Sequence, residues 1–130
     1  MSRRDPRVTL RQILEHARLA RELCSGKTLQ EILANWQTRL AFERVMEILG
    51  EAVKRLPDDL RVKCPSVDWK GAAGMRDHVA HGYDVVDHNV LWKAVREEVP
   101  GLIATADKML RDLEEGSEKP DGWRGKVNDR

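Results

Sequence analysis

The chain has few of the features that mark membrane proteins, secreted proteins and strand-rich proteins. No apolar run approaches the roughly 20 residues of a transmembrane helix, and residues 1–6 lack the apolar stretch of a signal peptide. Aromatic residues make up only 5% of the 130 residues, and no two-residue period indicates a β-strand. These absences favour a cytoplasmic, helical protein with no membrane contact.

Cysteine and net charge are also scarce. The two cysteines, Cys24 and Cys64, lie far apart and match no metal-ligand or redox spacing, so we expect two free thiols in a reducing compartment. The formal net charge is +1, which gives the molecule a weak overall field. A nucleic acid would therefore have to be bound by a local basic patch.

The hydrophobic pattern predicts amphipathic helices along the first half of the chain. Apolar residues recur at spacings of three and four over residues 10–24 and again over residues 41–56, where Pro57 ends the pattern. Between these segments, Thr28 stands three residues before Glu31, which is typical of a capping box that opens a short helix.

The second half is predicted to hold two more helices after a loop over residues 61–69, in which Trp69 is an expected anchor. The first of these helices starts before Arg76 and runs as one element toward Trp92 and Val95. The last covers residues 102–113, with a proline in its first turn.

These elements predict an all-α, antiparallel bundle of four to five helices. A chain of this length fits one domain with one core, which we place at residues 1–115. Residues 116–130 are rich in glycine and charge and are expected to form a flexible or loosely docked tail.

Gly50 interrupts the third predicted helix. Glycine costs a helix interior about 1 kcal/mol relative to alanine, so its presence suggests the close approach of another helix, from the same subunit or from a second one. A merely tolerated glycine is the alternative.

Residues 76–83 combine an arginine, a histidine and a tyrosine, which together suit the handling of a phosphodiester better than they suit a buried core. Arg76 stays charged and offers paired donors to a phosphate, and His81 can exchange a proton near neutral pH. On a continuous helix the two are separated by roughly 140°, but the arginine side chain is long enough to reach toward the histidine, so both can line the mouth of one cleft. Tyr83 adds a phenol. The alternative is that Tyr83 is simply a tyrosine at the edge of the core.

The same helix would gather a polar sector around His81. Asp77 stands four residues before it and can accept from the imidazole N–H, while Asp84 and His88 follow on the same face. A solvated helix face is the simpler interpretation. A third interpretation is a metal site that also uses His78. No recognised ligand spacing is present, so we expect no metal site.

Five other residues have plainer interpretations. His16 is most simply a helix-surface residue, because no partner stands at a useful spacing. The tryptophans are more simply core or interface anchors than platforms for stacked bases; they are Trp36, Trp69, Trp92 and Trp123.

From residue 10 to residue 113 the chain resembles the HepT-like toxins of the HEPN superfamily. The segments that carry the resemblance are Ile48–Ala52, Pro65 with Asp68–Trp69, Gly74–Tyr83, Val86–Asp87, Val90, Trp92 and Val99–Leu102. The family signature is an arginine, four residues, a histidine, one residue and a tyrosine. It assigns the catalytic roles to Arg76 and His81.

The resemblance implies an endoribonuclease that needs no metal or other cofactor. The ribose 2′-hydroxyl would attack the adjacent phosphorus and leave a 2′,3′-cyclic phosphate, with His81 as general base or acid and Arg76 stabilising the phosphorane. Asp77 stands where the family usually has asparagine. A carboxylate beside the phosphate site would weaken RNA binding or raise the pKa of His81, so it bears on the activity and not on the fold.

The resemblance also implies partners. Such toxins form homodimers whose motif helices face across a shared cleft, and they belong to type VII toxin–antitoxin pairs. The antitoxin, an MntA-like nucleotidyltransferase, modifies the motif tyrosine by AMPylation, which here is Tyr83. Two alternatives remain: a catalytically silent subunit that binds a nucleotidyltransferase, and a structural helical dimer without phosphate chemistry.

Overall fold

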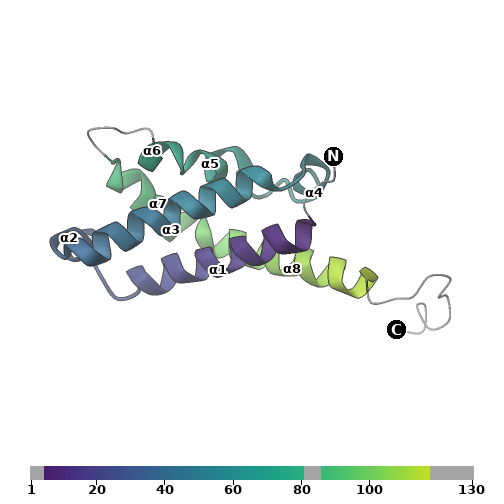
Figure 1. Cartoon of the computed structure of the whole chain (residues 1–130), viewed down its shortest axis with the longest axis horizontal. Coiled ribbons are helices and arrows are strands. Elements are labelled where there is room, and N and C mark those ends of the chain that lie inside the picture. The colour runs from purple at the N-terminus through teal and green to yellow at the C-terminus, as the bar shows by residue number, and fades with distance from the viewer. Residues whose placement is uncertain (1–4, 81–85, 118–130) are drawn as a thin grey trace.

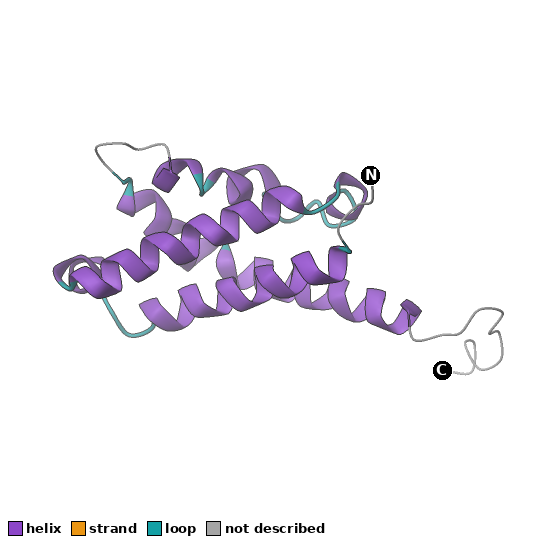
Figure 2. Cartoon of the chain, in the orientation of Figure 1, coloured by secondary structure: helices purple, strands orange, loops and turns teal. Residues whose placement is uncertain are grey.

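The computed structural model describes residues 5–80 and 86–117, and in these ranges every regular element is a helix (Figures 1 and 2). The all-α prediction is confirmed. No helix within these ranges is both long and apolar enough to cross a membrane. The elements are α1 Pro6–Cys24, α2 Leu29–Ala34, α3 Trp36–Arg55, α4 Asp58–Arg61, α5 Trp69–Gly74, α6 Asp77–Ala80, α7 His88–Glu97 and α8 Val99–Ser117.

Helix α1 begins one turn earlier than its apolar pattern indicated. Asp5 accepts a hydrogen bond from the backbone N–H of Arg7, and Pro6 occupies the first turn, where its missing N–H costs nothing. A hydrogen bond from the Arg7 side chain, followed by the one from its backbone, lowers the pKa of Asp5 to about 2. The cap is therefore ionised near neutral pH.

The predicted capping box is confirmed at the start of α2. Thr28 Oγ1 accepts from the backbone N–H of Glu31 at 3.2 Å, and the Glu31 carboxylate accepts from the backbone N–H of Thr28 at 2.8 Å. Only Asn35 separates α2 from α3, and its side chain caps α3 by accepting from the N–H of Thr38. Helix α3 then ends just before Pro57, as predicted.

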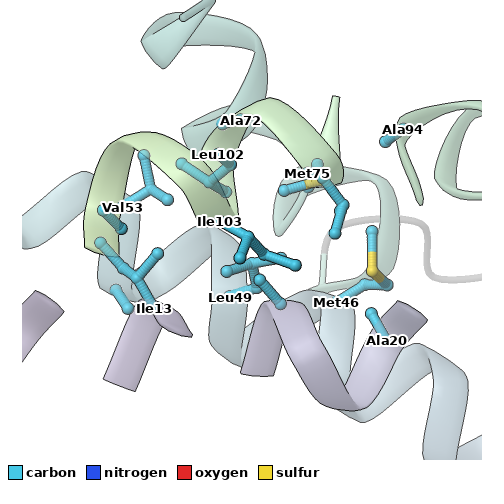
Figure 3. Close-up of a cluster of buried hydrophobic side chains, with 14 of the residues drawn as sticks. Ile13, Ala20, Met46, Leu49, Val53, Ala72, Met75, Ala94, Leu102 and Ile103 are labelled. Atoms are coloured by element: carbon cyan, nitrogen blue, oxygen red, sulfur yellow. The ribbon is translucent and has the colours of Figure 1, made fainter. Parts of the chain in front are cut away.

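Helix α3 is the centre of the bundle. It packs against α1 on one side and against α5 and α6 on another, while α8 packs along α1 and α7 (Figure 1). Figure 3 shows apolar side chains from α1, α3, α5, α7 and α8 meeting in a single core. Phe42, Met46 and Leu49 of α3 are fully buried there.

The prediction of one continuous helix from the motif to Val95 is wrong. Helix α6 is described over Asp77–Ala80, and α7 starts afresh at His88, where the Asp87 side chain accepts from the N–H of Val90. The hydrophobic period spans both segments, but the cap at Asp87 separates them. Residues 81–85, with His81, Tyr83 and Asp84, lie outside the described residues.

Two short helices were not predicted. Helices α4 and α5 flank the loop that contains Pro65, and each is too short for a periodic pattern to be visible. Trp69, at the start of α5, is buried, and its indole N–H donates to the Cys64 carbonyl at 3.0 Å. Its predicted role as an anchor is confirmed.

The other tryptophans differ in exposure. Trp92 is partly buried, with the Arg96 guanidinium 5.7 Å from its ring centroid. Trp36 is 64% exposed and is not a core residue, while Trp123 lies outside the described residues. Most of the predicted tail also lies outside the described residues, which end with α8 at Ser117.

Both cysteines are free thiols, as predicted. Cys24 is buried at the end of α1, and burial raises the pKa of its thiol to about 11.

Gly50 marks a close approach, and the approaching segment belongs to the same chain. A Cβ atom at this position would lie 2.7 Å from the backbone nitrogen of Arg76 and 3.2 Å from the carbonyl oxygen of Ala73. The glycine therefore lets the end of α5 lie directly on α3. It does not require a second subunit.

Replacing Gly50 with alanine is expected to destabilise the protein by roughly 1–3 kcal/mol, because backbone atoms must shift to admit the methyl group. Urea denaturation followed by circular dichroism measures the change. The matched control is Gly101→Ala in α8, where a Cβ meets nothing within 4 Å and a gain of up to about 1 kcal/mol is expected. Equal stability of the two variants would contradict this account of the contact.

Candidate functional site

Arg76 lies in the turn between α5 and α6, and the core holds that turn in place. The preceding residue, Met75, is 2% exposed and packs in the hydrophobic core, as Figure 3 shows. Gly50 contacts the backbone on the other side. The Arg76 side chain, 25% exposed, is therefore presented from a rigid backbone at the edge of α3.

Glu51, the residue after Gly50, pairs with Arg76. Its Oε1 lies 2.8 Å from Arg76 Nε, which is buried. The two atoms are close enough for an ion pair, but their geometry does not meet the requirements of a hydrogen bond. A pair with both partners about a quarter to a third exposed contributes at most about 1 kcal/mol, so its main effect is to orient the guanidinium.

Arg55 shares the same carboxylate. Its Nη2 lies 3.9 Å from Glu51 Oε2, one helical turn away, and its Nη1 donates to Gln12 Oε1 of α1 at 3.0 Å. Glu51 thus stands between two guanidinium groups, each nearest to a different oxygen. One carboxylate cannot balance both charges.

These side chains line a polar groove of about 450 Å³, where α1, α3 and the Arg76 turn meet. The lining residues are Gln12, His16, Arg44, Glu47, Ile48, Glu51, Arg55 and Arg76. Three arginines face two glutamates there, which leaves one net positive charge without counting the histidine. This excess of positive charge favours a ligand of the opposite sign, so the groove suits an anion.

His16 belongs to this groove, contrary to its interpretation as a plain surface residue. Its side chain is 15% exposed, and Nδ1 lies 2.9 Å from the backbone carbonyl oxygen of Gln12. A carbonyl can only accept, so Nδ1 carries the proton and donates. Nε2 has no hydrogen-bond partner among the described residues.

Among the other predicted site residues, those that the structure describes contact different groups. Asp77 is 62% exposed, and its carboxylate lies 3.8 Å from Arg76 Nη1. His78 lines a different, more apolar hollow of about 270 Å³ together with Met75 and Val90. His88 pairs with α3, since its Nε2 lies 2.7 Å from Glu43 Oε2.

The described residues offer no metal site: nowhere in 5–80 or 86–117 do three or more histidine, cysteine or acidic side chains gather in a way that could hold an ion. The geometry instead assembles guanidinium groups and an imidazole around polar space. Such a groove can bind a phosphate by charge-assisted hydrogen bonds and can exchange a proton.

Sequence reasoning missed Glu51, Arg55 and His16 as members of the site. Only one signal for them was local: Glu51 and Arg55 stand four residues apart, the spacing of an ion pair on one helix face. His16 is 60 positions from Arg76 in the chain. No spacing rule joins them, because their contact depends on how α1 packs against α3.

Comparison with known proteins identifies the family of the chain. Residues 13–109 match the family described as "Ribonuclease HepT-like". A protein of Methanocaldococcus jannaschii whose name describes it as a candidate RNase is 35% identical over 114 residues, covering 88% of this chain and 94% of the relative. A protein of Caldanaerobacter subterraneus, named in the same way, is 34% identical over 108 residues, covering 83% and 96% of the two chains.

A third relative is the "Probable ribonuclease HepT" of Thermococcus cleftensis, 35% identical over 102 residues, covering 78% of this chain and 93% of the relative. No solved structure matches the chain. The matched region contains α3, the Arg76 turn and the Arg76–His81–Tyr83 signature, and it leaves out only the chain ends. The chain belongs to the HepT-like ribonuclease family.

Proposed function

We propose that this protein is an endoribonuclease and the toxin of a toxin–antitoxin pair. The observation that carries the proposal is the Arg76 guanidinium, which Glu51 orients at the edge of a polar groove with excess positive charge. Family membership supports the same reaction, since the relatives are named as ribonucleases.

The chemistry follows from the side chains. The ribose 2′-hydroxyl attacks the adjacent phosphorus while a base removes its proton, and the bond from phosphorus to the 5′-oxygen breaks as that oxygen gains a proton. The products are a 2′,3′-cyclic phosphate and a free 5′-hydroxyl. Arg76 stabilises the negative charge of the phosphorane, and His81 transfers one of the two protons.

The proposal includes inhibition of the ribonuclease by a partner protein. The protein acts as a homodimer, and a cognate nucleotidyltransferase inhibits it by attaching a nucleotidyl group to Tyr83. That residue is two positions from His81 in the chain, so an anionic adduct there repels an approaching RNA backbone.

A catalytically silent subunit that binds a nucleotidyltransferase is the second candidate. The observation that favours it is the Asp77 carboxylate 3.8 Å from Arg76 Nη1, which competes with a phosphate for the same guanidinium.

Cleavage should be lost when either catalytic side chain is removed. Arg76→Ala and His81→Ala are expected to cut single-stranded RNA at least about 100-fold more slowly than the parent, with chelator present and without added metal. Arg18→Ala in α1, which removes an exposed arginine paired with Asp107, is the charge-matched control. Full activity of both variants would refute the assignment, and a folded parent that cuts no RNA would favour the second candidate.

Glu51→Gln should separate orientation from stability. The amide keeps the size of the side chain and removes the charge that holds Arg76, so cleavage is expected to fall about tenfold or more while the free energy of unfolding changes by less than about 1 kcal/mol. Glu22→Gln, on an exposed position of α1, is the control. Wild-type cleavage by Glu51→Gln would show that Arg76 needs no such support.

Tyr83→Phe should uncouple the toxin from its antitoxin. The phenylalanine lacks the hydroxyl that accepts the nucleotidyl group, so the variant is expected to cleave RNA and to stay unmodified and active after incubation with the nucleotidyltransferase and ATP. Intact-mass spectrometry detects the adduct. An adduct of the same mass on the variant would place the modification on another residue.

A further inference from the structure

The groove extends well beyond Arg76, and its far part has no role in the reaction as proposed. Arg55 stands one helical turn beyond Glu51 on α3, and His16 faces it from α1. Both are within the described residues, and both retain groups that no atom of residues 5–80 or 86–117 uses.

The Arg55 guanidinium is held in place with donors to spare. Gln12 Oε1 accepts from Nη1 at 3.0 Å, and Glu51 Oε2 lies 3.9 Å from Nη2. A guanidinium has five N–H donors in a fixed plane, so these two contacts leave it able to bind a phosphate. The side chain is 40% exposed, which leaves it accessible from the groove.

The charge balance favours an anion at Arg55 as well as at Arg76. Among the described residues, Glu51 is the only carboxylate within 4 Å of the Arg55 guanidinium, and it lies closer to Arg76, at 2.8 Å against 3.9 Å. Arg44, further along α3, has its own partner, Glu47, at 3.0 Å. Arg55 is therefore the guanidinium in the groove whose charge is least neutralised.

His16 offers a hydrogen-bonding atom of a specific kind. The Gln12 carbonyl accepts a hydrogen bond from Nδ1–H, which keeps a proton on Nδ1. Nε2 therefore accepts a hydrogen bond when the ring is neutral and donates one when the ring is protonated. A ribose 2′-hydroxyl both donates and accepts, so it suits Nε2 in either state. A deoxyribose offers no such group.

We propose that the groove between α1 and α3 is a nucleotide-binding subsite next to the site of cleavage, in which Arg55 binds a backbone phosphate of single-stranded RNA and His16 binds a ribose 2′-hydroxyl. This inference rests on the proposed ribonuclease function. It extends the RNA contact along α3 by one nucleotide and gives the protein a means of distinguishing RNA from DNA.

Binding measurements on full-length protein test the subsite. All variants carry His81→Ala so that RNA stays intact, and the probes are a fluorescent single-stranded RNA and the DNA of the same sequence. Arg55→Ala is expected to weaken binding of both probes about tenfold and to reduce the slope of log affinity against log salt by about 0.7, the value for one phosphate contact on a single strand. Arg55→Lys, which keeps the charge, is expected to retain most of the slope.

His16→Ala should act differently. It is expected to weaken RNA binding about twofold to tenfold, to leave DNA binding and the salt slope unchanged, and so to lower the ratio of the two affinities. His16→Gln, which keeps a polar group of similar reach, should restore part of that ratio. Circular dichroism melts confirm that each variant is folded.

Arg18→Ala is the matched control, because it removes one arginine from α1 outside the groove and should leave affinity and slope unchanged. Equal affinity and slope for Arg55→Ala and its parent, or an unchanged RNA-to-DNA ratio for His16→Ala, would overturn the subsite. Absence of RNA binding by the His81→Ala parent itself would instead overturn the proposed function.

Discussion

The contact between Gly50 and the backbone of Arg76 is the constraint on which the site depends. Without a side chain at Gly50, the end of α5 can lie directly on α3, and the next residue, Glu51, then meets the Arg76 side chain at 2.8 Å. Gly50 thus sets the distance between the two backbones, and the adjacent Glu51 orients the guanidinium. A larger residue at position 50 would disturb packing and chemistry together.

The groove shows how a nearly neutral protein can still attract a polyanion. The whole chain carries a net charge of +1, so its long-range field is weak. Locally, three arginines from two parts of the fold surround two glutamates, and Glu51 serves both Arg55 and Arg76. Because ion pairs at partly exposed positions contribute little stability, we interpret this cluster as a means of placing charge.

Prediction from the sequence succeeded where a long helix buries one regular face, and it failed where short-range signals compete. Helices α1, α3 and α8 follow from apolar spacing, capping residues and prolines. The apolar period also continues from Met75 to Val95, yet the Asp87 side chain caps a new helix there. His88, the first residue of that new helix, pairs with Glu43 of α3.

The sequence by itself determined the helical class, the position of the longest helices and the family signature, and it marked Gly50 as a candidate close contact, because each depends on residues that are neighbours in the chain. Only the tertiary structure decided that Gly50 is approached from within the same subunit, that Glu51 orients Arg76, and that His16 and Arg55 belong to one groove with it. The reason is physical: side chains 60 positions apart meet only through the packing of α1 and the α5–α6 segment against α3, and the periodic pattern of each helix identifies its buried face without naming the partner.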